Sequence, residues 1–293
     1  MKIAAAAYPL SAFSDWTALA EKRAQWVADA AGQGANLLVF PEYSGLELSA
    51  LDGPEASGDL RGCVAAASRH LPRALEQFRS LAQTHQVHIC TGTTPLHLDG
   101  GEVVNRAHLI APSGAIGAQD KLIPTPYERA PWIIGPGTGL TVFDTALGRI
   151  AILVCYDSEF PLLARAAVEG GADLLLVPSA TDTHAGYHRV RIGAQARALE
   201  CQCPVVQAPL VGAAPWCPAV DINHGAAGVF APPDTGLPDN GVIALGPYDT
   251  PGWTCAEIDL GRFTAVRRDG QVRTRAHWPE QGARRAATGI PLR

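Results

Sequence analysis

The residue with the clearest chemical potential in this sequence is Cys155. It ends an apolar run of strand length at 150–154, and the apolar residues from Leu162 to Ala167 have the spacing of one helix face. Cys155 is therefore expected at a strand-to-helix turn. Unpaired N–H groups and the positive end of a helix dipole stabilise a thiolate or an oxyanion there. The position suits a nucleophile, although a single cysteine can also be an inert buried thiol.

Two acids and a lysine elsewhere in the chain could serve such a nucleophile. Glu42 stands just past a buried strand expected at 36–40, and ligand sites in open α/β sheets lie beyond the carboxyl ends of strands. Lys121 and Glu128 flank two prolines, which should forbid a regular helix and stiffen the loop. Solvated surface positions are the alternative for all three residues.

The composition limits the class of protein. A chain of 293 residues with 47% hydrophobic residues can form one large α/β domain. The net charge of -5 gives no electrostatic footprint for nucleic acid or anionic membrane. No apolar run approaches the ~20 residues of a bilayer span, and residues 1–7 indicate a first strand rather than a signal peptide. Partners should be small molecules and other protein chains.

Cysteine and histidine spacing argues against a metal site. The seven cysteines form neither a paired framework nor a Cys-x-x-Cys motif, which fits reduced thiols in a cytoplasmic protein. His184 and His188 are four residues apart, but a glycine lies between them and the His-Glu-x-x-His pattern is absent. We therefore expect no bound metal.

Two stretches of the chain share one pattern. Residues 34–42 and 171–179 match almost position by position, each with an apolar strand followed by proline and a polar residue. Such strands need cover on both faces, whereas the predicted helices are apolar on one side only. Two sheets packed face to face with helices outside satisfy both needs. The expected helices are 15–31 (capped by Ser14), 70–86, 162–170 and 187–201, and the other expected strands are 87–93, 103–111, one reaching 143, 204–208, 226–231, 241–245 and 254–259.

Three segments in order resemble the signature segments of the nitrilase superfamily of carbon-nitrogen hydrolases. They are Phe40-Pro41-Glu42, then Lys121 with Pro124 and Glu128, then Val154-Cys155-Tyr156-Asp157 followed by Phe160-Pro161. The stretch Ala196-Arg197-Ala198-Leu199-Glu200 also resembles a helix of that family. The resemblance runs from residue 3 to about residue 260.

The resemblance implies a fold, an assembly and a reaction. The fold would be α/β, a four-layer αββα sandwich in one domain at 1–265, with a tail at 266–293 that packs on the domain or on a partner subunit. The helices would pair in a homodimer or a larger assembly. The chemistry would use a Glu-Lys-Cys triad without a metal or organic cofactor, and the substrate would be a small amide-type molecule.

The expected roles follow from the residue types. A thiol near neutral pH is mostly protonated, so Glu42 would accept the proton of Cys155. Lys121 and the N–H of Tyr156 would stabilise the oxyanion, each such donor contributing ~3–4 kcal/mol. Ammonia or an amine would leave, and Glu42 would activate water to hydrolyse the thioester. Glu128 would orient Lys121 or the substrate.

The residues after the nucleophile bear on the substrate. Cys155-Tyr156-Asp157 resembles the amidase-like members, whereas true nitrilases usually read Cys-Trp-Glu, so hydrolysis of a linear amide or a carbamoyl amine is expected. Relatives that act on carboxylate-bearing substrates have arginine where this chain has Ser158 and Glu159. Glu159 is therefore expected to favour neutral or amine-bearing substrates, unless it only caps the helix dipole. Further residues expected to bind substrate are Tyr43, Tyr127, Ser179 and His188.

The motifs leave other functions open. Nitrile hydrolysis and acyl transfer to an amine or alcohol would use the same residues. A non-catalytic binding subunit could also keep the fold, since sequence does not show that the polar residues converge.

Overall fold

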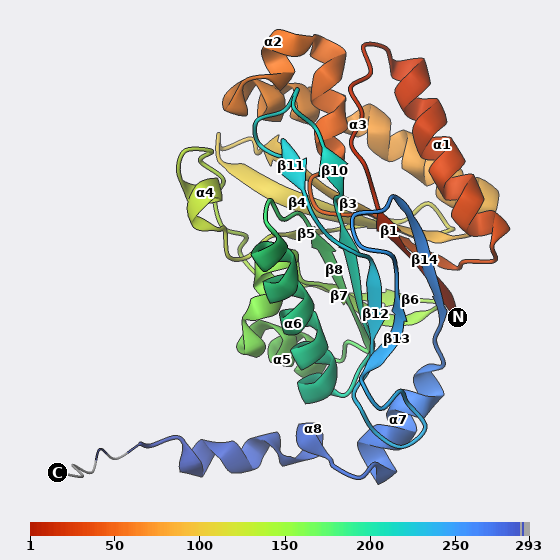
Figure 1. Ribbon diagram of the computed structural model, residues 1–293, viewed down its shortest axis with the longest axis vertical. Coiled ribbons are helices and arrows are strands. Elements are labelled where there is room, and N and C mark those ends of the chain that lie inside the picture. Colours follow the sequence, from red (N-terminus) through yellow and green to blue (C-terminus); the bar gives the residue numbers. More distant parts are fainter. Residues whose placement is uncertain (288, 290–293) are drawn as a thin grey trace.

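The two similar stretches form the centres of two separate sheets. Their strands, β2 (Leu37–Val39) and β8 (Leu174–Ser179), are buried along their whole length, and each pairs in parallel with a strand on either side. The computed structural model, which describes residues 1–287 and 289, therefore has the two expected half-sheets of similar design (Figure 1).

Each sheet has six strands. In sheet order, the first consists of β14 (Gly252–Glu257), β1 (Lys2–Ala7), β2, β3 (His88–His97), β4 (Val103–Ile110) and β5 (Ile116–Asp120). The second consists of β13 (Val242–Leu245), β12 (Gly228–Phe230), β9 (Val205–Pro209), β8, β7 (Gly148–Ile152) and β6 (Val142–Thr145). The short strands β10 (Gly212–Ala213) and β11 (Ile222–Asn223) pair separately.

The longer helices cover the outer faces of the sheets. Figure 1 shows α1 and α3 beside the first sheet, and α5 and α6 beside the second. The helices are α1 (Trp16–Gly32), α2 (Pro54–Ser57), α3 (Leu60–His85), α4 (Pro126–Arg129), α5 (Pro161–Glu169), α6 (His184–Cys201), α7 (Leu260–Asp269) and α8 (Thr274–His277), with 3₁₀ helices η1 (Ser44–Asp52), η2 (Cys155–Glu159) and η3 (Trp278–Arg284). The four-layer αββα arrangement is confirmed.

Strand alternation divides the apolar residues between two cores. Ile3 and Leu37 of the first sheet join Ile152 and Leu176 of the second in one buried cluster between the sheets. The neighbour Leu38 points the other way and packs with the residues of α1 and α3. Because side chains of a strand alternate between faces, one apolar strand can serve both layers.

Local signals misplaced some helix boundaries. The side chain of Asp15, rather than Ser14, caps α1 by accepting a hydrogen bond from Ala18 N at 3.0 Å. Helix α3 starts ten residues before the predicted position 70, where Asp59 caps it. The prediction of no helix between Lys121 and Glu128 was wrong at its end, because Pro126 begins the single turn α4, and proline is tolerated at the first helical position.

The C-terminal segment folds back on the domain at first. The expected boundary at residue 265 falls inside α7, where Phe263 and Val266 are both buried, and Trp278 packs against the core between the sheets. A separate tail from residue 266 onward therefore stays a prediction, and its last residues lie outside those described. Among the described residues, no helix has the length and apolar character needed to cross a membrane.

Gly92 allows the first sheet to approach the segment that carries Glu42. It has φ +72° at an irregularity of β3, and a Cβ atom there would lie 1.9 Å from the carbonyl oxygen of Pro41. The same carbonyl accepts a hydrogen bond from Thr93 N at 3.2 Å. Only glycine fits both the left-handed backbone and this close contact.

We predict that Gly92→Ala lowers the free energy of unfolding by about 3 kcal/mol, combining the left-handed backbone penalty with overpacking. Gly34→Ala is the matched control, because Gly34 has φ +82° but nothing within 4 Å of the added Cβ, and it should cost only about 1 kcal/mol. Urea unfolding of the two variants measures both values. Equal losses would show that the contact with Pro41 contributes nothing.

Candidate active site

Three chemically active side chains meet beyond the same edge of the two sheets. Glu42 follows β2, Lys121 follows β5 directly, and Cys155 follows β7 after two residues. Strand β5 runs parallel to β2, because β3 pairs in parallel with β2 and two antiparallel pairings then lead to β5. Carboxyl ends of parallel strands lie at one edge, which is where α/β folds place their sites.

Cys155 is the first residue of η2 and has a strained backbone conformation. Its φ of +47° is left-handed, which is uncommon for a residue other than glycine and often marks a functional position. Ser158 Oγ donates to the Cys155 carbonyl at 2.7 Å, and the Cys155 thiol lies 3.7 Å from the carbonyl oxygen of Ala180. The side chain is buried, with 5% of the residue exposed.

Lys121 lies between two buried carboxylates. Its Nζ is 2.8 Å from Glu42 Oε1 and 2.7 Å from Glu128 Oε2, and all three side chains are at most 3% exposed. Other donors hold the carboxylates: Asn105 Nδ2 at 3.0 Å and Ala180 N at 3.1 Å bond Glu42. Glu128 accepts from Thr125 N at 2.7 Å and from the hydroxyl of Tyr43.

The pKa values of Glu42, Lys121 and Glu128 are shifted in different ways. Burial raises the pKa of Glu42 to about 7, and the Lys121 ammonium offsets only part of this effect. Burial alone would lower the pKa of Lys121, but the two carboxylates outweigh it and hold that pKa above its usual value. Lys121 in turn keeps the pKa of Glu128 below its usual value despite burial. At neutral pH, Glu42 is thus the group able to exchange a proton.

The Cys155 thiol can act as a nucleophile only if a neighbouring group accepts its proton. Burial, and secondly the negative charge of Glu42, raise the pKa of Cys155 well above its usual value, so the resting thiol is protonated. A carboxylate with a pKa near 7 is suited to accept its proton during attack on a carbonyl carbon. Lys121 and Tyr156 line the same cavity as Cys155, and Tyr156 lies in the first turn of η2, where backbone N–H groups have no intrahelical acceptor.

Asp157 fastens the lysine segment to the cysteine turn. Its carboxylate accepts hydrogen bonds from Leu122 N at 3.0 Å, Ile123 N at 2.8 Å and Val154 N at 3.2 Å. Although these bonds favour the charged form, burial dominates and raises the pKa of Asp157 to about 6. On the other side of the turn, Arg197 Nη1 donates to the Ser158 carbonyl at 3.0 Å.

A cavity of about 430 Å³ opens onto this cluster. Its lining includes Glu42, Lys121, Glu128 and Cys155, the expected oxyanion donor Tyr156, and three of the five residues expected to bind substrate, namely Tyr43, Tyr127 and Glu159. The volume suits a small molecule.

The structure does not bring two expected residues, Ser179 and His188, into the cavity. Ser179 is still part of β8 and pairs with β9, its hydroxyl lies 3.4 Å from the Ala208 carbonyl, and the residue is 1% exposed. His188 lies on α6 and faces a separate hollow shared with Tyr187 and Tyr248. Neither side chain is placed to bind a substrate beside Cys155.

Sequence analysis missed other residues of the site, some beside the buried cluster and some in the cavity lining. Asn105, which holds Glu42, is a buried polar residue within the apolar strand β4, and that mismatch was a usable signal. Arg189, Asp182 and the segment 218–223 also line the cavity, but they come from α6 and loops without any motif. Only the three-dimensional fold brings them there.

Comparisons with known proteins show the family and the fold of this chain. The family model described as carbon-nitrogen hydrolase matches residues 2–268. The chain is 32% identical over 274 residues to the "Probable hydrolase YhcX" of Bacillus subtilis, covering 93% of this chain and 52% of that protein. It is 30% identical to the "Deaminated glutathione amidase" of Synechocystis sp., covering 80% and 84%. The chain spans about half the length of the first curated relatives it matches.

Among solved structures, a carbon-nitrogen hydrolase from Helicobacter pylori G27 superposes with a TM-score of 0.74. The match covers 92% of each chain at 20% sequence identity. At this identity the similarity establishes the fold.

The cluster predicts how the reactivity of Cys155 depends on pH. Glu42 accepts the thiol proton only as a carboxylate, which predominates above its pKa of about 7. Alkylation of Cys155 by iodoacetamide should therefore accelerate as pH rises through 7. Glu42→Gln should remove this step and slow alkylation roughly 10²-fold at pH values above it. Peptide mass spectrometry follows the reaction, with the other six thiols as internal controls. An unchanged pH profile in the variant would exclude Glu42 as the base.

Proposed function

This chain belongs to the carbon-nitrogen hydrolase family, and we propose that it hydrolyses small linear amides or carbamoyl amines through a thioester on Cys155. The observation that supports the proposal most directly is the buried group of Glu42, Lys121 and Glu128 beside a buried thiol in a small cavity. A purely structural ion cluster would not need a strained cysteine at its side.

The reaction begins with proton transfer and attack. Glu42 accepts the proton of the Cys155 thiol as the sulfur attacks the amide carbon. The carbonyl oxygen becomes an oxyanion, which Lys121 and the Tyr156 N–H stabilise. Glu42 then gives the proton to the leaving nitrogen, the carbon-nitrogen bond breaks, and ammonia or an amine departs from the thioester.

The second half reverses these roles. Glu42 takes a proton from water, which attacks the thioester carbon. The oxyanion forms again at the same donors, the carbon-sulfur bond breaks, and the thiolate recovers the proton from Glu42. The products are the free carboxylic acid and the resting enzyme, so no metal or organic cofactor is required.

Glu128 acts through Lys121. Its carboxylate receives hydrogen bonds from the backbone of Thr125 and the hydroxyl of Tyr43, and it holds the ammonium from the side opposite Glu42. With a second carboxylate present, the ammonium stays charged and in place while Glu42 is protonated. Glu128 is therefore a positioning residue in this mechanism.

Charge in the cavity supports neutral or amine-bearing substrates. The lining contains five acidic residues, Glu42, Glu128, Glu159, Asp182 and Asp221, and two basic ones, Lys121 and Arg189. Glu159 Oε1 lies 3.7 Å from Arg189 Nε, so this exposed arginine offsets part of its charge. The remaining acidic residues of the lining disfavour substrates that carry a carboxylate in addition to the reacting amide. The amidase among the relatives agrees with an amide as the reacting group.

A homodimer or larger assembly remains part of the proposal. Apolar side chains on the outer faces of α5 and α6 support it, since Leu162 is 73% and Ile192 is 65% exposed. Exposed apolar groups on neighbouring helices are typical of surfaces that bind another chain.

We predict that the protein releases ammonia from members of a panel of small amides, carbamoyl amines and nitriles, and that Cys155→Ala lowers the rate by about 10⁴-fold or more. Intact-mass spectra should show a transient acyl adduct on the parent protein alone. Ammonia only from nitriles, or a new amide formed when an amine acceptor is added, would replace the proposal by nitrile hydrolysis or acyl transfer. A panel with neither ammonia nor adduct would favour a binding role.

We further predict that Glu159→Gln weakens the preference for amine-bearing over matched carboxylate-bearing amides by about fivefold, as expected for the loss of ~1 kcal/mol of charge interaction near a surface. Arg189→Gln is the matched control and should shift the preference in the opposite direction. The ratio of kcat/KM values for the two substrates measures the effect. An unchanged ratio in Glu159→Gln would mean that this acid only caps α5.

A further inference from the structure

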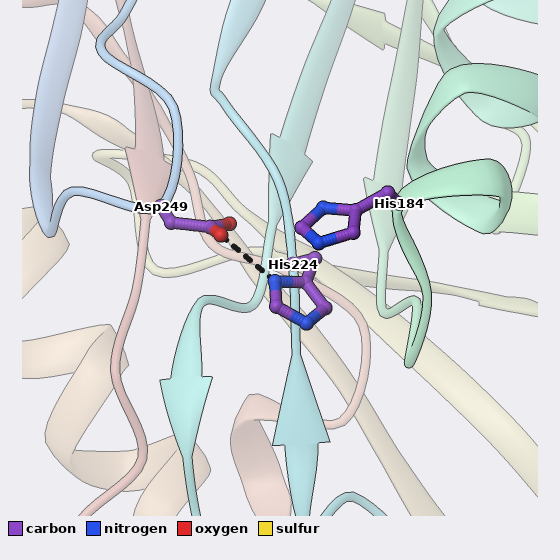
Figure 2. Close-up of side chains that lie close together, drawn as sticks. All are labelled: His184, His224 and Asp249. Atoms are coloured by element: carbon purple, nitrogen blue, oxygen red, sulfur yellow. Dashed lines mark hydrogen bonds and ion pairs between the residues drawn. The ribbon is translucent and has the colours of Figure 1, made fainter.

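A second group of chemically active side chains lies outside the cavity. His184 is the first residue of α6, His224 follows β11, and Asp249 lies between β13 and β14. Figure 2 shows the two imidazole rings beside each other, with the carboxylate next to His224. One ligand atom from each residue lies within 4.8 Å of the other two. These residues are far apart in sequence, and neither the mechanism nor the motifs use them.

From this arrangement we propose that His184, His224 and Asp249 bind one divalent transition-metal ion of the zinc type. Two imidazoles and one carboxylate form a common zinc ligand set, with further positions left to water. At metal-ligand distances of 2.0–2.1 Å, ligand atoms in a tetrahedron stand roughly 3.4 Å apart. The exposed side chain of His184, at the start of its helix, can move the remaining distance.

The ligand atoms follow from the hydrogen bonds. His184 Nδ1 lies 2.7 Å from the Tyr248 hydroxyl, which leaves Nε2 as its ligand atom. His224 Nδ1 lies 2.8 Å from Asp249 Oδ2, so these two atoms would be the ligand atoms of that pair. In the neutral tautomer that carries its proton on Nε2, the ring offers the Nδ1 lone pair to the metal.

Neighbouring residues already hold Asp249 and the loop of His224 in place. Gly225 N donates to Asp249 Oδ1 at 2.8 Å, and Asp249 N donates to the Gly225 carbonyl at 2.7 Å. Asp249 itself has a left-handed φ of +52°. Together with the contact of His184 to Tyr248, these bonds are the kind of outer-shell support that orients metal ligands. Beside the group lies a cavity of about 270 Å³ that admits water for the open positions.

The proposed site connects to one wall of the active-site cavity. His224 N donates to the Thr181 carbonyl at 2.8 Å, and Thr181 Oγ1 donates to the His224 carbonyl at 2.8 Å. Thr181 lines the cavity and follows Ala180, whose N–H bonds Glu42. A bound ion would thus fasten α6 and two loops to this wall. Its role is structural and is compatible with metal-free chemistry at Cys155.

Zinc titration by calorimetry tests the proposal on the full chain, with any affinity tag removed and with Cys155→Ala to remove the active-site thiol. We expect one Zn²⁺ per chain. His224→Ala and Asp249→Asn should each weaken binding at least about tenfold. Asp249→Asn retains a side-chain oxygen for Gly225 N, so it should preserve the loop. His188→Ala is the matched control, because His188 lies one turn along α6 outside the group, and binding should be unchanged.

Two further measurements keep the result independent of folding defects and of other thiols. Thermal unfolding without metal should be the same in parent and Asp249→Asn, and added Zn²⁺ should raise Tm only in the parent and in His188→Ala. Co²⁺ in the parent should give visible bands without the thiolate charge-transfer band of cysteine ligation. Three outcomes would each overturn the proposal. They are no zinc binding by the parent, zinc binding by His224→Ala and Asp249→Asn that is as tight as in the parent, and a thiolate charge-transfer band with Co²⁺.

Discussion

The site depends on one ammonium group that is buried between two carboxylates. Removing a lysine from water costs several kcal/mol, which only well-placed opposite charges can offset. Glu42 and Glu128 supply these charges for Lys121, and backbone or side-chain donors hold both acids. Burial also raises the pKa of Glu42 to about 7. The exclusion of water that makes the ion cluster necessary therefore also gives Glu42 a pKa suited to proton transfer near neutral pH. Loss of one member would leave an uncompensated charge.

The sequence predicted the site best where a chemically active residue closely follows a recognisable strand. Glu42 and Cys155 each follow an apolar strand, and α/β folds place their sites beyond the carboxyl ends of such strands. The repeated pattern at 34–42 and 171–179 indicated two similar sheets, and β2 and β8 confirm it. Resemblance to the nitrilase superfamily agrees with the family match over residues 2–268. Strand position and face periodicity are local properties, and a sequence displays them directly.

The sequence did not show which side chains from distant parts of the chain reach the cavity. Ser179 occupies the repeat position equivalent to Glu42, yet β8 continues through Ser179, which pairs with β9. In the first sheet, β2 already ends at Val39, so Glu42 lies in the segment beyond the strand. His188 belongs to α6, and the residue range of a helix does not tell which of its sides faces the cavity. Arg189 and the segment 218–223 reach the cavity only through the packing of α6 and of loops. These positions depend on contacts between residues distant in sequence, for which no local pattern exists.

The hydrogen bonds of Asp157 have a consequence for the order in which the protein acquires its chemistry. Glu42 and Lys121, the proposed base and cation, follow strands of the first sheet, whereas Cys155, the proposed nucleophile, follows a strand of the second. Asp157 joins the two by accepting hydrogen bonds from Leu122 N and Ile123 N. A ribosome adds Glu42 and Lys121 to the chain before it reaches codon 155, but β14, which completes the first sheet, comes about a hundred residues later. In a nascent or partly unfolded chain, Cys155 therefore lacks the proposed base beside it. In the proposed mechanism, acylation of Cys155 would require that the two sheets have docked.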